Sequence, residues 1–372
     1  MSSLAKATGI KYTRAADIDD YNGLGCGIAR GVPREGIEAA MQRITRNILI
    51  GMGAGAAALA AGTFAMADFM FHLSLDTRYS HLMERLMSGG ETARYLETPH
   101  RDAKEEAEAS RWFEEAKQPV TVTSEDGLKL HGWLFDADNA SPTPHLYAIC
   151  MHGYTGQPSE MAKYAHRFAR LGFTVLVPAQ RAHELSEGRY VGMGWLERRD
   201  LMCWVRLVTD ADPEARILLD GISMGAATVM MTLGEPDLPR NVTAAIEDCG
   251  YSSVWDQFLF NAKGMYHLPR RWLALPVVAC MSAICKHVAG YGFREASSVA
   301  SLRRTTIPVL FIHGGADTFV DPAFLDRNIA ACASIDRERL LVPGASHALS
   351  ASTDPVRYWK RATGFVTRVF GL

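Results

Sequence analysis

Three residue types that act together in acyl transfer stand at the predicted strand ends of this chain: a serine, an acid and a histidine. Ser223 lies between two glycines in the run GISMG, which covers 221–225. An apolar strand-like run precedes the serine and an apolar helix-like run follows it, as a nucleophilic serine on a strand-to-helix turn requires. Because the chain holds 32 glycines among 372 residues, such a run also arises by chance, so its partners decide its meaning.

The two partners follow Ser223 in the order expected of a triad in an open α/β sheet. Asp317 closes the apolar run LFIHGGAD, and His347 closes the next strand-like run, LVPGASH. Open α/β sheets place reacting groups beyond the carboxyl ends of their strands. We therefore predict His347 as the general base and Asp317 as the acid that orients it. Asp248 and Asp321, which also stand near strand ends, remain alternatives for the acid.

Backbone N–H groups beside the serine complete the predicted site. Met224 opens the helix after Ser223, and Tyr154 lies in the run MHGYTG at the end of an earlier strand. The first N–H groups of a helix have no partner within it, and they favour negative charge. We predict that the N–H groups of Met224 and Tyr154 hold the oxyanion, and that His152 supports the loop of Tyr154. No group of His, Asp and Glu residues has metal-ligand spacing, so neither a metal nor a cofactor is expected.

Strand-like runs alternate with helix-like runs from about residue 119 onward. The strands are predicted at 120–123, 128–136, 145–152, 173–178, 216–220, 242–247, 307–313 and 339–342. The first two flank the turn-rich tetrad SEDG and indicate a hairpin, whereas the others alternate with helices, as in a parallel sheet. The pattern predicts an α/β fold with a mainly parallel eight-stranded sheet and helices on both faces.

With these motifs the chain resembles the α/β-hydrolases from about residue 110 to its end. It is similar to bacterial membrane-anchored serine hydrolases grouped near monoacylglycerol lipases and prolyl or serine aminopeptidase-like enzymes, and the runs MHGYTG and GFREAS carry part of the likeness. The resemblance implies an α/β-hydrolase fold with an N-terminal anchor. The run AQRAHELSEG at 179–188 departs from the Asp-x-Arg-Gly-x-Gly-x-Ser of many relatives, so their substrate preference is not carried over.

Residues 48–67 form a stretch of 20 residues without a charge. As a helix rising about 1.5 Å per residue, the stretch is long enough to cross a bilayer, and we predict a transmembrane signal anchor there. Arg43 and Arg46 precede it and Asp68 follows it, so we expect a single-pass protein of the cell membrane with an extracytoplasmic catalytic domain. A buried core helix and a cleaved signal peptide starting at Met41 remain the alternatives.

The predicted organisation has four parts. Residues 1–47 are a flexible tail, 48–67 the anchor, 68–118 a linker with helices, and 119–372 the catalytic domain. Within this domain, residues 255–291 exceed the length of a plain crossover and are rich in Trp, Phe, Met and Leu, which predicts a helical lid. The apolar side chains of the lid either line a pocket for an acyl or aromatic group or form the lid's own core. They are Phe258, Phe260, Met265, Tyr266, Trp272, Leu273, Leu275 and Met281.

The predicted reaction is hydrolysis of a small-molecule carboxylic ester, and the apolar lid favours a lipid-like one. The triad also allows an amidase, a peptidase or an acyltransferase, and a non-catalytic binding protein on the same fold stays open. The net charge of −2 gives no field that draws nucleic acid, so nucleic acid is not expected as a partner, whereas the bilayer is. The seven cysteines are expected mainly as buried apolar residues, with a Cys280–Cys285 disulfide left open.

Overall fold

The computed structural model describes residues 34–79, 100–139, 143–265 and 270–372. The chain divides into two compact units, Met1–Ala58 and Leu59–Leu372. The described part of the first unit is helical, because α1 (Arg34–Leu75) begins there and its last residues belong to the second unit. Residues 1–33 of the predicted tail lie outside the described residues, and 34–47 belong to α1 rather than to a tail.

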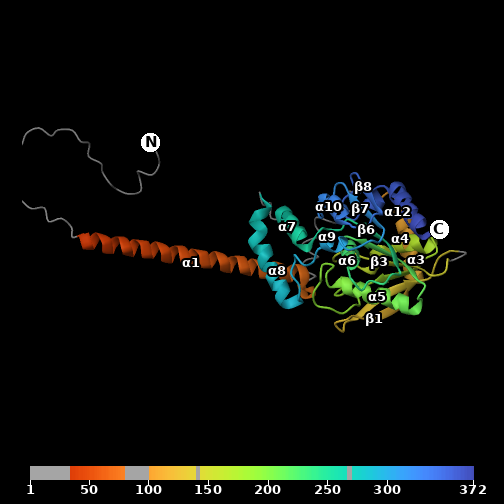
Figure 1. Ribbon diagram of the computed structural model, residues 1–372, viewed down its shortest axis with the longest axis horizontal. Helices are drawn as coiled ribbons and strands as arrows, with labels where there is room; N and C mark the ends of the chain where they lie inside the picture. Colours follow the sequence, from red (N-terminus) through yellow and green to blue (C-terminus); the bar gives the residue numbers. More distant parts are fainter. Residues whose placement is uncertain (1–33, 80–99, 140–142, 266–269) are drawn as a thin grey trace, which may run out of the picture. The chain divides into compact units, whose positions relative to one another are not determined.

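The second unit is built on one sheet of eight strands (Figure 1). They are β1 (Gln118–Thr123), β2 (Lys129–Phe135), β3 (Leu146–Met151), β4 (Thr174–Pro178), β5 (Arg216–Ile222), β6 (Val242–Asp248), β7 (Val309–Gly314) and β8 (Arg337–Val342). Their order is β1-β2-β4-β3-β5-β6-β7-β8; the pairs β1–β2 and β2–β4 are antiparallel, and all the other pairs are parallel. The predicted mainly parallel eight-stranded sheet is confirmed.

Helices cover both faces of the sheet because its central strands carry apolar side chains on both faces. In β3, Ala148 and Cys150 face one core while Ile149 and Met151 face the other. The first core includes α3 (Ala103–Ala116), α4 (Ala162–Arg170), α11 (Ser350–Thr353) and α12 (Pro355–Phe370). The second includes α5 (Glu197–Ala211), α6 (Met224–Thr232), α9 (Ser298–Leu302) and α10 (Ala323–Ala331). Short 3₁₀ turns lie at η1 (Thr77–Tyr79) and η2 (Pro158–Met161).

A third core joins the insertion between β6 and β7 to the end of α1. The insertion consists of α7 (Val254–Met265), η3 (Arg271–Ala274) and α8 (Leu275–Ala289). Met281 of α8 is buried with Phe71 of α1, and Phe258 of α7 stacks on Phe293 at a centroid distance of 4.7 Å. The second unit therefore starts at Leu59, ahead of the predicted catalytic domain at 119.

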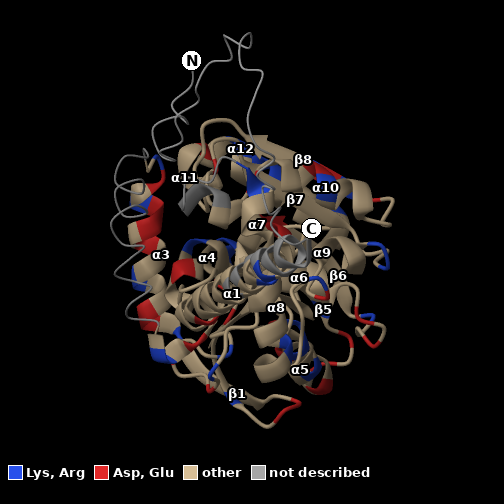
Figure 2. Ribbon diagram, turned by 90° about the vertical axis from the view of Figure 1, so that its left-hand side faces the viewer, with Lys and Arg blue, Asp and Glu red and all other residues tan. Residues whose placement is uncertain are grey.

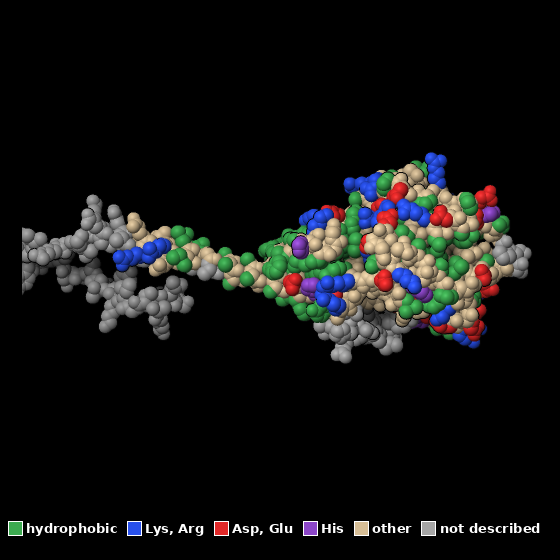
Figure 3. Space-filling model, turned by 90° about the horizontal axis from the view of Figure 1, so that it is seen from below, with side chains coloured by type: hydrophobic (Ala, Val, Ile, Leu, Met, Phe, Trp, Pro, Cys, Tyr) green, Lys and Arg blue, Asp and Glu red, His purple; other side chains and the backbone are tan. Residues whose placement is uncertain are grey.

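The same region leaves large apolar side chains exposed. On α1 these are Leu59, Phe64, Met66 and Phe69, and on η3 and α8 they are Trp272, Leu273, Leu275 and Val288. Figure 3 shows hydrophobic side chains gathered at this end of the second unit. Within the part of the chain that the structure describes, two helical stretches, Gly55–Leu75 and Arg271–Ala289, are long and apolar enough to span a bilayer by length and composition.

Helix α3, predicted as part of the linker, packs directly on the sheet. It is amphipathic: Phe113 is buried, Trp112 stacks on Phe135 at 4.7 Å, and charged residues mark its other face (Figure 2). Lys163 of α4 forms an ion pair with Glu106 of α3 at 2.6 Å. Residues 100–116 are therefore an integral part of the second unit.

Candidate active site

The serine lies on the turn where β5 passes into α6, as its sequence context predicts. Ser223 has φ 57° and ψ −114°, a conformation that is costly for a residue with a side chain. A Cβ at Gly221 would lie 2.5 Å from the backbone of Gly225, and a Cβ at Gly225 would overlap the carbonyl oxygen of Met151. Because these neighbours are backbone atoms of packed elements, only glycine fits on either side of the serine.

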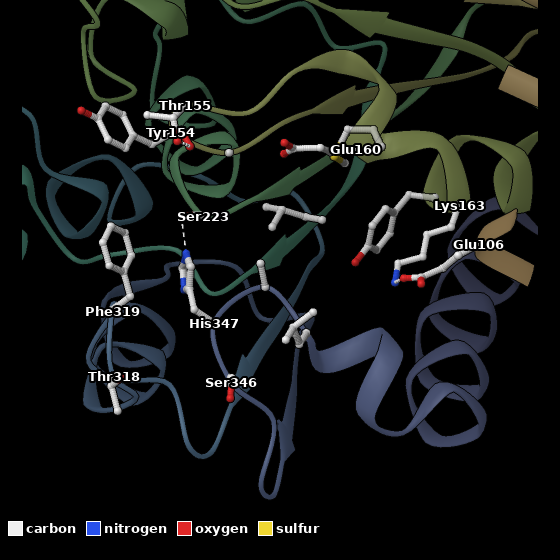
Figure 4. A pocket seen from close by; sticks show the side chains of 16 residues that line it. Glu106, Tyr154, Thr155, Glu160, Lys163, Ser223, Thr318, Phe319, Ser346 and His347 are labelled. Carbon is white, nitrogen blue, oxygen red and sulfur yellow. Dashed lines mark hydrogen bonds and ion pairs between the residues drawn. The ribbon is translucent and has the colours of Figure 1, made fainter. Parts of the chain in front are cut away.

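Ser223, His347 and Asp317 form one hydrogen-bonded chain. His347 Nε2 lies 2.9 Å from Ser223 Oγ (Figure 4), and His347 Nδ1 lies 2.7 Å from Asp317 Oδ2. A carboxylate can only accept, so Nδ1 carries the hydrogen and Nε2 is free to accept the hydroxyl proton. The fold thereby brings together residues from three strand ends. The two most distant in sequence, Ser223 and His347, are 124 positions apart.

The carboxylate of Asp317 is buried and held by several donors. Its Oδ1 accepts from the N–H groups of Phe319 at 2.8 Å and Val320 at 2.9 Å, and its Oδ2 also lies 3.3 Å from His313 Nε2. Burial alone would raise the pKa of Asp317, but His347 and His313 outweigh it and hold the pKa well below its usual value. Asp317 therefore remains a carboxylate, as an acid that orients a histidine must.

The other two candidate acids have different partners. Asp248 accepts a hydrogen bond from Ser350 Oγ at 3.1 Å, and burial raises the pKa of its carboxyl to about 6. Asp321 pairs with Arg271 at 2.8 Å. The short bond to His347 Nδ1 thus favours Asp317 as the orienting acid.

The loop after β3 lies against the serine. A Cβ built on Gly153 would lie 3.6 Å from Ser223 Cβ, and Tyr154 and Thr155 line the same cavity as Ser223. Met224 is the first residue of α6, so its N–H has no acceptor within the helix. The two residues predicted to supply oxyanion donors therefore lie beside Ser223.

Two residues hold the start of this loop. His152 Nε2 accepts the N–H of Gln180 at 3.1 Å, so Nδ1 carries the hydrogen and donates to the carbonyl of Gly153 at 2.8 Å. The Gln180 amide in turn donates to the carbonyl of His152 at 2.6 Å. Burial lowers the pKa of His152 to about 3, which keeps the imidazole neutral, as one donor and one acceptor require. His152 thus supports the loop, and Gln180 is a second support that no sequence pattern indicated.

Arg181, in the segment after β4, is buried. Its guanidinium donates twice to Asp200 at 2.6 Å and twice to Asp126. A buried arginine needs such partners, because an unpaired charge is costly away from water. This clamp ties the segment after β4 to α5 and to the β1–β2 turn.

A cavity of about 540 Å³ opens on the serine. In Figure 4, Tyr154, Thr155 and Phe319 lie on one side of Ser223, and Glu106 and Lys163 lie on the other. The remaining lining residues are Gly153, Glu160, Met161, Tyr164, Ile222, Thr318, Ser346, His347, Ala348 and Leu349. No described residue of the insertion at 255–291 lines this cavity, and Phe258 and Met281 pack instead in the third core, which the insertion shares with the end of α1.

Sequence reasoning missed several residues of this site. His313 stands four positions before Asp317 in LFIHGGAD, and that spacing on a buried strand end is a signal that could have found it. Glu106 and Lys163 carried no signal, because the segment of Glu106 was interpreted only as a docking helix and its distance from Lys163 in sequence is 57 positions.

Two groups among the described residues have the donor types of a metal site. One joins Cys249 to Asp317 and His347, with the ligand atoms within 4.8 Å of one another, and the other joins His100, Asp102 and Glu106. In the first group, Asp317 and His347 are hydrogen-bonded to each other. In the second, the ammonium group of Lys163 forms ion pairs with the carboxylates of Asp102 and Glu106. The six cysteines of the described residues are free thiols.

Solved structures with the same architecture define the class. The esterase Pf2001 of Pyrococcus furiosus matches with a TM-score of 0.52 and 25% identity, covering 68% of this chain and 91% of the esterase. The α/β-hydrolase GrgF of Penicillium sp. sh18 matches with a TM-score of 0.52 at 17% identity, covering 69% of this chain and 99% of GrgF, which supports the fold alone. With its sheet order and serine turn, this chain belongs to the α/β-hydrolase superfamily.

Curated relatives cover part of the chain. It is 31% identical over 186 residues to the uncharacterised protein YqkD of Bacillus subtilis, a match that covers 50% of this chain and 59% of YqkD. It is 28% identical over 233 residues to the uncharacterised protein Rv2307c of Mycobacterium tuberculosis, covering 62% of this chain and 73% of that protein. The chain thus spans less than two thirds of YqkD, and no family model matches it.

Proposed function

We propose that this protein is a serine hydrolase that cleaves a carboxylic ester through an acyl-enzyme, with Ser223, His347 and Asp317 as its triad. The observation that carries the proposal is the hydrogen-bonded chain from Asp317 through His347 to the Ser223 hydroxyl. The proton that must leave the hydroxyl already lies in a hydrogen bond to its acceptor, so no side chain has to move before attack.

In the first half-reaction, Ser223 Oγ bonds to the ester carbonyl carbon while its proton passes to His347 Nε2. The π electrons move onto the carbonyl oxygen, and the N–H groups of Met224 and Tyr154 stabilise the oxyanion. Collapse of this intermediate breaks the bond to the alcohol oxygen, which takes the proton from His347. Water then attacks the acyl-enzyme in the same way and releases the carboxylic acid and free Ser223. Asp317 stays ionised and stabilises the imidazolium.

The choice of an ester rests on one comparison and one cavity. The esterase Pf2001, at 25% identity, matches over 91% of its length. The cavity of about 540 Å³ has the size of a small-molecule site, and Ile222, Phe319 and Leu349 give it apolar walls that suit an acyl chain. An amidase or peptidase would use the same triad, so amide substrates belong in the test.

We further propose that residues 48–67 anchor the chain in the cell membrane, with 255–291 as a lid beside the bilayer. The stretch Gly55–Leu75 has a mean hydropathy of 1.4, and Arg43 and Arg46 precede it, which favours an extracytoplasmic catalytic unit. Helix α8 is as apolar, but the chain continues from both of its ends into the second unit, so it suits the bilayer surface rather than a crossing. Protease added to intact cells should cut the catalytic unit; full protection would refute this orientation.

The test of the reaction is turnover of p-nitrophenyl esters of increasing chain length, alongside peptide p-nitroanilides, in membranes carrying the full chain. Ester hydrolysis that disappears in Ser223→Ala supports the proposal. Faster cleavage of the anilides would move the assignment to a peptidase. An optimum at the shortest acyl chain would contradict a lipid-like substrate.

A further inference from the structure

One hydrogen bond joins the end of α1 to the loop beside the serine. The hydroxyl of Tyr154 donates to the carbonyl oxygen of Ser74 at 2.5 Å, across 80 positions of sequence. Ser74 lies in the last turn of α1, where carbonyl groups have no partner within the helix and carry the negative end of its dipole. The phenol therefore satisfies an acceptor that the helix itself leaves open.

The end of α1 is held independently of this bond. Val191 N–H donates to the carbonyl of Leu75 at 2.8 Å, and Asp76, buried, pairs with Arg189 at 3.2 Å. Leu75 is 1% exposed within the third core. Leu75 and Asp76, which follow Ser74, are held by a backbone hydrogen bond, an ion pair and burial. The carbonyl of Ser74 is therefore a fixed acceptor for the Tyr154 hydroxyl.

The loop that contains Tyr154 lies beside Ser223. Gly153 packs against Ser223, and Tyr154 follows it directly in the chain. Gln180 and His152 hold the start of the loop, but Thr155, after Tyr154, has a left-handed φ of 57°, so the loop turns sharply at this point. Figure 4 shows the Tyr154 side chain directed away from Ser223. The phenol thus restrains the loop at Tyr154, on the side away from Ser223.

We propose that Tyr154 is a positioning residue that fixes the oxyanion loop to the carbonyl of Ser74, so that the end of the anchor helix is part of the active site. This inference rests on the proposed function, because it assigns the oxyanion role to the loop.

A purely structural bond would stabilise the fold without affecting the chemistry, and a matched variant separates the two roles. Tyr251 also donates its hydroxyl to a backbone carbonyl, that of Met193 at 3.0 Å, and it is buried in the same third core. Tyr154→Phe and Tyr251→Phe therefore each remove one phenol-to-carbonyl bond and keep the ring, but only the first removes a bond made by a residue of the oxyanion loop.

The kinetic test uses the full chain in membranes with a p-nitrophenyl ester and its thionoester, whose sulfur is a poor acceptor for oxyanion N–H groups. In Tyr154→Phe we expect kcat to fall about tenfold with KM within about twofold, a fraction of the loss that follows removal of an oxyanion donor. The preference for ester over thionoester should fall by a similar factor. Tyr251→Phe should leave both quantities unchanged.

Hydrogen exchange of the peptide 152–157, measured by mass spectrometry, tests independently of turnover whether the bond from Tyr154 to Ser74 restrains the loop. Exchange should rise in Tyr154→Phe and not in Tyr251→Phe. Unchanged loop exchange with unchanged kcat overturns the inference, and so does an equal loss of kcat in both variants. If loop exchange rises only in Tyr154→Phe but the wild type hydrolyses no ester, the proposed function is rejected, while the hydrogen bond from Tyr154 is still shown to restrain the loop.

Discussion

The strand ends that carry the proposed triad are held together by different forces from the region formed by α1 and the proposed lid. Around Asp317, four donors converge on one buried carboxylate, and glycines beside Ser223 let backbones touch. The α1–lid region is held mainly by apolar packing, and it exposes residues such as Phe64 and Trp272. Directional bonds fix atoms to fractions of an ångström, whereas apolar contacts tolerate rearrangement. This difference fits the roles proposed above, chemistry for the first region and contact with a bilayer for the second.

The largest effect on kcat should come from replacing Asp317, the proposed acid of the triad. Asp317→Asn keeps the shape of the side chain but loses the charge and the acceptor that fix the His347 tautomer, so kcat should fall about 10⁴-fold. Asp248→Asn, at the neighbouring strand end, should reduce kcat less than about tenfold. Steady-state ester hydrolysis measures both. The reverse ranking would assign the triad acid to Asp248.

The glycine beside the serine should be the next most sensitive position. In Gly225→Ala the new methyl overlaps the carbonyl of Met151, which cannot move out of β3, so we expect a loss of about 3 kcal/mol in unfolding free energy. Gly364→Ala on α12, where no atom lies within 4 Å of the added carbon, should gain up to about 1 kcal/mol. Thermal unfolding in detergent measures the stability of both variants. Equal changes in their melting temperatures would refute the packing argument.

The raised pKa of Asp248 predicts a pH-dependent stability. Its folded pKa of about 6 lies above the ordinary value of 3.8, so the folded protein holds a proton that the unfolded chain releases. This contribution is complete below the unfolded pKa and is lost as pH rises to about 6, a change of about 3 kcal/mol. Asp248→Asn cannot ionise there. The melting temperature of the variant minus that of wild type should therefore increase from pH 4.5 to pH 7.5, and a constant difference would contradict the shift.

The smallest effect on stability should come from the exposed lid surface. Trp272→Ser should change the unfolding free energy by less than about 0.5 kcal/mol, because the side chain is 60% exposed. If this surface lies against a bilayer, the variant should hydrolyse an ester held in vesicles about fivefold more slowly and a soluble ester at the same rate. Ile335→Ser, at a 98% exposed position between α10 and β8, is the control. Equal rates on vesicles for all three proteins would argue against lid–bilayer contact.

Local patterns predicted the sheet and the turn at Ser223 because those elements depend on short runs of sequence. Alternating apolar runs indicated eight strands, and the run GISMG indicated a serine on a strand-to-helix turn. The close backbone contacts that require glycine at 221 and 225 are seen only in the structure. The strand ends also placed Asp317 and His347 on one edge of the sheet, where they meet.

Other features depend on packing between distant segments, which spacing does not encode. The lid residues were assigned with equal weight to a pocket or to a lid core, since apolar composition suits both; Phe258 and Met281 lie in a core. The bond from Tyr154 to Ser74 crosses 80 positions, and no motif marks either partner. Residues 34–47 were expected to belong to a flexible tail, but they form the first part of α1.

The central claim is that Ser223 is the nucleophile that His347 activates, and an active-site-directed fluorophosphonate tests it most directly. Membranes carrying the full chain are treated with the probe, and the peptide that contains residues 221–225 is examined by mass spectrometry. We predict one phosphonyl adduct on Ser223 in wild type, none in Ser223→Ala, and a rate of labelling strongly reduced in His347→Ala. An unlabelled wild type, or a label on another residue that persists in Ser223→Ala, would contradict the account.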